Sequence, residues 1–229
     1  MKILSIDTSS KICAVAILQD ENLIKENLID NGQTHSEKLM PMIKEILTCT
    51  ELSLKDIDLI VCDKGPGSFT GIRIGIATVK AFADSLNIPC IGISSLEALC
   101  FNVKTNGLIC SMIDARNENV YWSCFENKNG KYILKHEFAV DSLDSVLETL
   151  TNYNTPITFV GDASVCYHEK ITQVLPNSIF CLQNGLSAYN LGLAGLTKFK
   201  NNQMEDFMPL YIRKPQAEQM LEARLNESK

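Results

Sequence analysis

The predicted strands and helices occur in the same order in both halves of the chain, and this repeat limits the fold more than any other feature. In the first half, apolar periodicity predicts strands and helices over residues 2–7, 12–18, 23–29, 35–47, 59–62, 71–86 and 90–93, with a further helix from 95. In the second half, the corresponding elements cover 108–114, 120–125, 132–138, 141–150 and 157–161, a helix after 162, a strand at 179–182 and a helix from 187. Each half therefore reads β-β-β-α-β-α-β-α.

Two tandem units of this order, each ribonuclease-H-like, form the actin-like (ASKHA) α/β fold of actin, the sugar kinases and Hsp70. The expected division is an N-terminal lobe over 1–104, a C-terminal lobe over 105–205 and a C-terminal segment over 206–229, with packing of that segment on the N-terminal lobe left as an option. A fold of this kind does not determine a function, so the sites have to be argued from their residues.

Members of this fold that are kinases hold ATP between the lobes, against the first turn of each lobe. In the first turn, hydroxyls and turn amides are available from four residues, which are the candidate contacts with a nucleotide: Asp7, Thr8, Ser9 and Ser10. The second turn, residues 114–119, has two acids, one base and no glycine, so its backbone is poorly suited to phosphate. An ATP-dependent small-molecule kinase is the alternative function, with either Asp7 or Asp114 as its base.

A glycine-rich stretch, KGPGSFTGIRIG, covers residues 64–75 and follows an apolar strand. It does not match the Walker A pattern, because Lys64 precedes the glycines and Pro66 removes an amide donor. An anion near the start of the following helix remains an option, as does a contact with another subunit. The candidate residues of this loop are Gly65, Gly67, Ser68 and Thr70.

Two helices of the first half have wider apolar faces than one sheet contact requires. The helix over 71–86 has few polar residues, and the helix over 35–47 has an apolar arc of about 160° that includes two methionines. The pattern favours docking of a partner, although the two helices could instead cover each other and the sheet. The predicted partner-binding residues are Leu39, Met40, Ile43, Leu47, Arg73, Ile74, Ala77, Thr78 and Ala81.

Composition excludes several classes of protein. The net charge is −6, and no cluster of Lys and Arg occurs along the sequence, so another chain is expected to make most contacts with any nucleic acid. The nine cysteines include no C-x-x-C pair, which argues against a disulfide framework, and Cys166 with His168 lacks further ligands for a metal. No signal peptide or apolar run of about 18 residues occurs, so a cytoplasmic protein without a membrane contact is expected.

Six segments occur in the order found in one family: ILSIDTSS, THSEKLMP, GPGSFTGIRIG, ISSLEAL, IDARNENVY and PLYIRKP. Over essentially its full length the chain resembles the TsaB (YeaZ) family. The resemblance implies a role in making N6-threonylcarbamoyladenosine in tRNA. TsaB-like proteins are non-catalytic paralogues of the transferase TsaD and bind it through N-terminal helices. The ATPase TsaE joins the complex, and TsaB-like proteins form homodimers through the same surface when alone.

One further comparison concerns catalysis. TsaD-like transferases carry a metal-binding H-x-E-G-H motif, and the corresponding stretch here is Ser95-Leu96-Glu97-Ala98-Leu99. Since leucine cannot bind a metal, the resemblance implies no metal and no catalytic residue, which also argues against a metallopeptidase. The prediction is a scaffold or activator subunit that performs no reaction and contacts tRNA mainly through the complex. It needs no cofactor of its own, with ATP or ADP at an interface of the complex left open.

Overall fold

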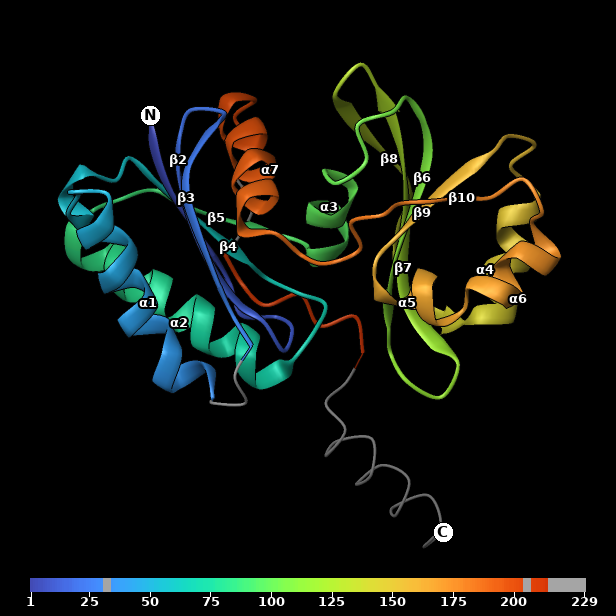
Figure 1. The fold of residues 1–229 in the computed structure, drawn as a ribbon, viewed down its shortest axis with the longest axis horizontal. Helices are drawn as coiled ribbons and strands as arrows, with labels where there is room; N and C mark the ends of the chain where they lie inside the picture. The colour runs from blue at the N-terminus through green and yellow to red at the C-terminus, as the bar shows by residue number, and fades with distance from the viewer. Residues whose placement is uncertain (31–33, 204–206, 214–229) are drawn as a thin grey trace, which may run out of the picture.

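The computed structural model describes residues 1–30, 34–203 and 207–213, which form two lobes side by side, each built on a five-stranded sheet (Figure 1). The first sheet has the order β3-β2-β1-β4-β5, with strands β1 Lys2–Asp7, β2 Cys13–Gln19, β3 Asn22–Ile29, β4 Leu59–Asp63 and β5 Cys90–Ile93. The second has the order β10-β9-β6-β7-β8, with β6 Gly107–Asp114, β7 Asn119–Lys128, β8 Lys131–Ser142, β9 Ile157–Val160 and β10 Ile179–Phe180. In both sheets the first three strands are antiparallel and the rest pair in parallel.

The α-helices occur where the sequence predicts them, and the short helix η1 Leu54–Asp56 was not predicted. The α-helices are α1 His35–Cys49, α2 Phe69–Leu86, α3 Ser95–Cys100, α4 Leu143–Thr151, α5 Asp162–Cys166, α6 His168–Val174 and α7 Ala188–Lys200. A capping box begins α1, where the Thr34 amide donates to Glu37 Oε2 at 3.0 Å. Ser142 caps α4, and the Asp141 carboxylate before it accepts from Trp122 Nε1 at 2.8 Å. The predicted order of elements is therefore confirmed, with the helix after 162 divided into two.

Helices cover both faces of the first sheet. The apolar sides of α1 and α2 pack with one face, and α7 lies on the other (Figure 1). By chain order α7 falls within 105–205, whereas its contacts are with β1, β2, β4 and β5 of the first sheet. The last helix of the chain therefore completes the core of the N-terminal lobe.

Helix α3 and part of the C-terminal segment both lie between the lobes (Figure 1). Helix α3 is in contact with β6 and β7 of the second sheet and with α7. Of the predicted C-terminal segment the structure describes residues 207–213, which run from the first lobe toward the second (Figure 1). The Leu210 amide donates to the Lys64 carbonyl at 2.7 Å, and Arg213 Nη1 donates to the Ala115 carbonyl at 3.3 Å. We call residues 207–213 the C-terminal strap. Within the described part of the chain, no helix has the length and apolar character needed to span a membrane.

Candidate functional site

The glycine-rich loop packs directly on the turn that follows β1. The Ser68 amide donates to the Ser9 carbonyl at 2.7 Å, and Thr8 Oγ1 donates to the Gly71 carbonyl at 2.8 Å. A Cβ atom added at Gly67 or Gly71 would collide with the carbonyl oxygen of Ser9 or Thr8. The glycines are therefore required for close approach of two backbone segments, and the loop uses its polar groups internally.

Two buried carboxylates lie beneath this contact, at the ends of adjacent strands. Asp7 ends β1 and Asp63 ends β4, and each is only 1% exposed. The Ser9 amide donates to Asp7 Oδ1 at 2.7 Å, and Ser9 Oγ donates to Asp63 Oδ2 at 3.2 Å. Asp63 Oδ1 also accepts from the Gly65 amide at 2.6 Å and from Ser95 Oγ at 2.7 Å. Asp63 thus fixes the turn, the glycine-rich loop and α3 to one another.

Burial raises the pKa of both carboxyl groups, because a charged carboxylate loses its hydration there. The negative charge of Asp7 raises the pKa of Asp63 further, and the hydrogen bonds from Ser9 and Ser95 oppose these effects only in part. Within residues 1–30, 34–203 and 207–213, Asp7 Oδ2 has no hydrogen-bond partner. The arrangement therefore favours a proton held on the pair, and it places neither carboxylate where it could meet a solvent-borne substrate.

The residues predicted to contact a nucleotide come together, but most of their side chains are enclosed. Four of these residues are buried: Asp7, Thr8, Ser9 and Gly65. Ser10 and Gly67 are half-buried, and Ser68 and Thr70 are exposed. Ser68 caps α2 by accepting from the Gly71 amide at 3.2 Å, as the sequence indicates. The corresponding turn of the second lobe, residues 114–119, has left-handed backbone conformation at Arg116, Asn117 and Glu118, with φ of 66°, 53° and 56°. That conformation is uncommon outside glycine, and here it occurs at three consecutive residues.

Each position of α3 that corresponds to the H-x-E-G-H motif is occupied in packing. Ser95 donates to Asp63, as described above. Glu97 Oε2 lies 2.9 Å from Lys198 Nζ on α7, with both side chains mostly buried, and Leu99 is in the core between the lobes. Among the described residues, no group of three or more His, Cys, Asp or Glu side chains is placed to hold a metal ion.

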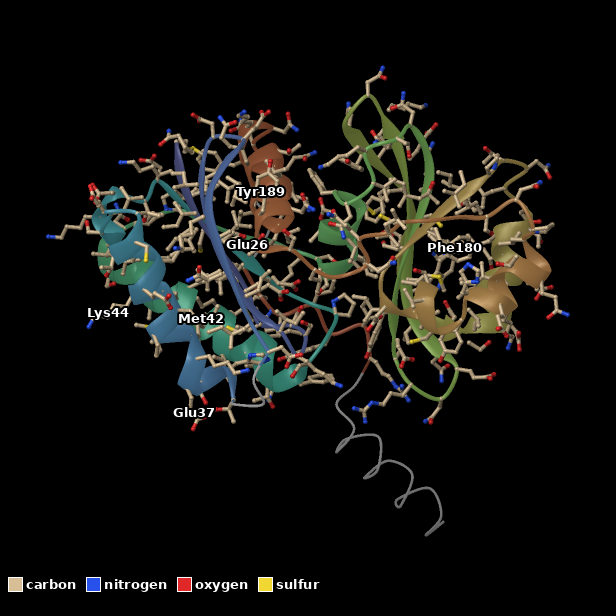
Figure 2. The ribbon with its side chains drawn as sticks, in the orientation of Figure 1. Glu26, Glu37, Met42, Lys44, Phe180 and Tyr189 are labelled. Carbon is tan, nitrogen blue, oxygen red and sulfur yellow. The ribbon has the colours of Figure 1, made fainter. Side chains whose placement is uncertain are left out.

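The structure divides the predicted partner-binding residues of α1. Leu39, Ile43 and Leu47 are buried in the core with the first sheet, so their side chains cannot face a partner, which corrects that part of the prediction. Their wide apolar arc arises because α1 packs on both the sheet and α2, the alternative that the sequence left open. Met40 is 50% exposed, and Glu37 and Lys44 point away from the sheet (Figure 2).

On α2, the predicted partner-binding residues do form part of the surface. Arg73, Ala77 and Ala81 are exposed, and Ile74 and Thr78 are half-buried. We call Ile74, Ala77, Thr78 and Ala81 the α2 face. Apart from Ile74 its side chains are small, and none is charged, so a second helix could approach it closely.

Sequence reasoning missed Asp63 and the aromatic side of the strap. The signal for Asp63 was available, because it ends β4 as Asp7 ends β1 and immediately precedes the glycine-rich stretch. The Tyr211 ring stacks on Phe69 with centroids 5.0 Å apart, beside a small hollow also lined by Tyr121. No pattern in the sequence places Tyr211 there, since 141 residues separate the two stacked rings along the chain.

Comparison with known proteins assigns the family. Residues 30–221 match the family model described as TsaD, tRNA N6-adenosine threonylcarbamoyltransferase. The tRNA threonylcarbamoyladenosine biosynthesis protein TsaB of Bacillus subtilis is 33% identical over 225 residues, covering 95% of this chain and 96% of that protein. The chain belongs to the TsaB family. The TsaB of Haemophilus influenzae is 28% identical, covering 93% of this chain and 94% of its own.

Solved structures confirm the fold. A Pseudomonas aeruginosa protein described as similar to peptidase YEAZ superposes on this TsaB-family chain with a TM-score of 0.79 at 26% identity, covering 93% of this chain and 99% of the other. The ROK hexokinase of Thermus thermophilus, at 8% identity, gives a TM-score of 0.56 over 88% of this chain and 100% of the other. The second likeness concerns the fold alone, and it places this TsaB-family chain in the actin-like class predicted from its sequence.

Proposed function

We propose that the chain is a non-catalytic accessory subunit in the formation of N6-threonylcarbamoyladenosine in tRNA. It binds and stabilises the transferase TsaD, helps to recruit TsaE and acts in the cytoplasm, where it forms a homodimer when TsaD is absent. Its TsaB relatives are named for biosynthesis of this nucleoside, which supports the pathway. The observation that carries the non-catalytic role is that α3 has no pair of metal-binding side chains at the positions of the H-x-E-G-H motif.

At α3, the positions that correspond to metal ligands in TsaD-like transferases cannot support that chemistry. Serine and leucine replace the two histidines, and the remaining glutamate, Glu97, is paired with Lys198 at 2.9 Å. The nearby carboxylates, Asp7 and Asp63, are buried in contacts that hold the lobe together. A site whose three acidic groups are buried or paired in this way can support a partner more readily than it can transfer a group.

The α2 face is the surface proposed for TsaD and for the homodimer. Ala77 and Ala81 are exposed, and the half-buried Ile74 and Thr78 lie beside them. Exposed Met40 on α1 adds an adaptable apolar side chain to the same side of the first sheet. Small residues allow close helix contact, and such a contact would bury the methyl groups of both alanines.

A reconstitution experiment tests the accessory role. The chain is mixed with TsaD, TsaE, tRNA and threonylcarbamoyl-AMP, and the modified nucleoside is measured by mass spectrometry. We expect modification to depend on the chain, and the chain alone to produce none. Turnover by the isolated chain, or micromolar binding of Mg-ATP with phosphoryl transfer to a small molecule, would favour the kinase alternative instead.

Capture of TsaD tests the surface. Ala81→Glu would bury an unpaired charge, which costs roughly 3–5 kcal/mol, so we expect association to weaken by a factor of at least about one hundred. Val165→Glu is the matched control, because Val165 is 58% exposed on α5 of the other lobe. Equal capture of TsaD by both variants would remove the α2 face from the proposal.

A further inference from the structure

The arginines within the described residues lie on three segments that meet where the strap crosses between the lobes. Arg73 Nε on α2 donates to Tyr211 Oη at 2.8 Å. Two residues along the strap, Arg213 donates to the carbonyl of Ala115. The next residue of that turn is Arg116, whose side chain is exposed. We call Arg73, Arg116 and Arg213 the arginine cluster.

Aromatic rings accompany the cluster. The Tyr211 ring is stacked on Phe69 at an interplanar angle of 20°, and Arg73 Cζ lies 5.5 Å from the Tyr211 centroid. Tyr121 of β7 lines the same small hollow as Phe69, Tyr211 and Arg213. Tyr211 is 42% exposed, so part of this aromatic surface is open to solvent.

The arginines of the cluster form no ion pair with a carboxylate of the described residues. In the part of the chain that the structure describes, every ion pair uses a lysine or the N-terminus. Two acids lie on the same turn as Arg116, and each has contacts with groups other than a guanidinium. Asp114 Oδ1 accepts from the Arg116 amide at 2.9 Å and from Tyr167 Oη at 3.3 Å, and Glu118 pairs with Lys170 at 3.5 Å.

The N-terminus of α2 adds to the positive character of this region. The helix begins at Phe69, has 18 residues and directs the positive end of its dipole toward the strap. A positively charged site with exposed aromatic surface is unexpected in a chain of net charge −6. An anionic ligand that also offers flat rings would suit this site.

We propose that the arginine cluster binds the sugar-phosphate backbone of an RNA strand, with the exposed part of Tyr211 available to contact a base. The guanidinium group matches phosphate with two parallel hydrogen bonds, and aromatic rings stack on bases of any sequence. This inference rests on the proposed function, in which tRNA is the substrate of the complex. It adds a direct contact between this subunit and the RNA.

The experiment measures binding of fluorescently labelled tRNA to the full chain by anisotropy over a range of salt concentrations. The test variant is Arg116→Gln/Arg213→Gln, which leaves the α2 face unchanged. The control variant, Lys104→Gln/Lys131→Gln, removes the same amount of charge. Lys104 precedes β6 and Lys131 lies at the β7–β8 hairpin, so both are at the end of the second sheet away from the Arg116 turn. Loss of two phosphate contacts should reduce the slope of log K against log salt by about 1.4–1.8. The control should keep the wild-type slope.

Two further arms make the result specific. Arg116→Lys/Arg213→Lys keeps the charge and should keep most of the slope while binding more weakly, because lysine lacks the planar fork. Competition with AMP and ATP separates a free nucleotide from an RNA strand as the source of phosphate. Loss of nucleotide binding with unchanged tRNA binding in the arginine variant would overturn the assignment to RNA, as would equal slopes for the arginine and control variants.

Capture of TsaD by the same variants separates this inference from the proposed function. If the wild-type chain fails to bind TsaD or to support modification, the proposed function is wrong, whatever the salt slopes show. If it binds TsaD and the Arg116/Arg213 variant still binds tRNA like the wild type, only the RNA contact is wrong. The melting temperature of each variant confirms that the chain is folded.

Discussion

Gly71→Ala tests whether the glycine-rich loop is a packing device. Gly71 lies in the first turn of α2, and an added Cβ would collide with the Thr8 carbonyl oxygen and lie 3.1 Å from His35 Cδ2. The main obstacle is a backbone atom, which cannot rotate away, so α2 would have to move off the turn after β1. Alanine gains about 1 kcal/mol over glycine in an open helix, whereas overpacking costs about 1–3 kcal/mol or more. With an overpacking cost of about 3 kcal/mol and a gain of about 1 kcal/mol from alanine, we expect the free energy of unfolding to fall by about 2 kcal/mol.

For a domain of this size, that loss corresponds to a fall in Tm of about 4–8 °C. Gly185→Ala is the matched control, since an added Cβ there meets no atom within 4 Å. Removing chain freedom at such a site stabilises by about 0.4–1 kcal/mol, so the two substitutions should act in opposite directions. Thermal and urea unfolding of both variants measure the difference. If Gly71→Ala is as stable as Gly185→Ala, the loop is not held against the turn, and its glycines would be free for a ligand.

Two other predictions concern the interior of the first lobe. Because burial raises the pKa of Asp63 and Asp7, the folded chain binds more protons than the unfolded chain, and the free energy of unfolding should fall as pH rises from the ordinary carboxyl range near 4 through the folded pKa. Asp63→Asn keeps an acceptor for Ser95 and cannot ionise, so urea melts between pH 4 and 8 should show a smaller fall, and an unchanged pH dependence would refute the burial argument. Ile43→Ala should lose about 2–5 kcal/mol in urea unfolding, whereas Met40→Ala should lose less than about 1 kcal/mol, and similar losses would contradict the division of α1.

Local signals were sufficient for the order of elements. Strands such as Leu59–Asp63 are short apolar runs bounded by polar residues, and α1 begins at a capping box, so each could be recognised without its neighbours. The contacts of α1 could not be recognised in this way. A helical wheel shows how wide an apolar face is, but not whether the sheet, α2 or another protein covers it. Leu39, Ile43 and Leu47 were assigned to a partner for that reason, although the chain's own core buries them.

The arginine cluster shows the same limit in the electrostatics. Arg73, Arg116 and Arg213 are far apart along the chain and lie in no basic run, so the sequence predicted no basic site. The fold brings them together because α2 follows β4, the Arg116 turn follows β6, and the strap passes from one to the other. Charges farther away than about 8 Å are largely screened at physiological ionic strength, so the potential felt by a phosphate depends on these neighbours more than on the total of −6. An acidic subunit can therefore make a direct contact with RNA, and the salt dependence of binding is the property that would reveal it.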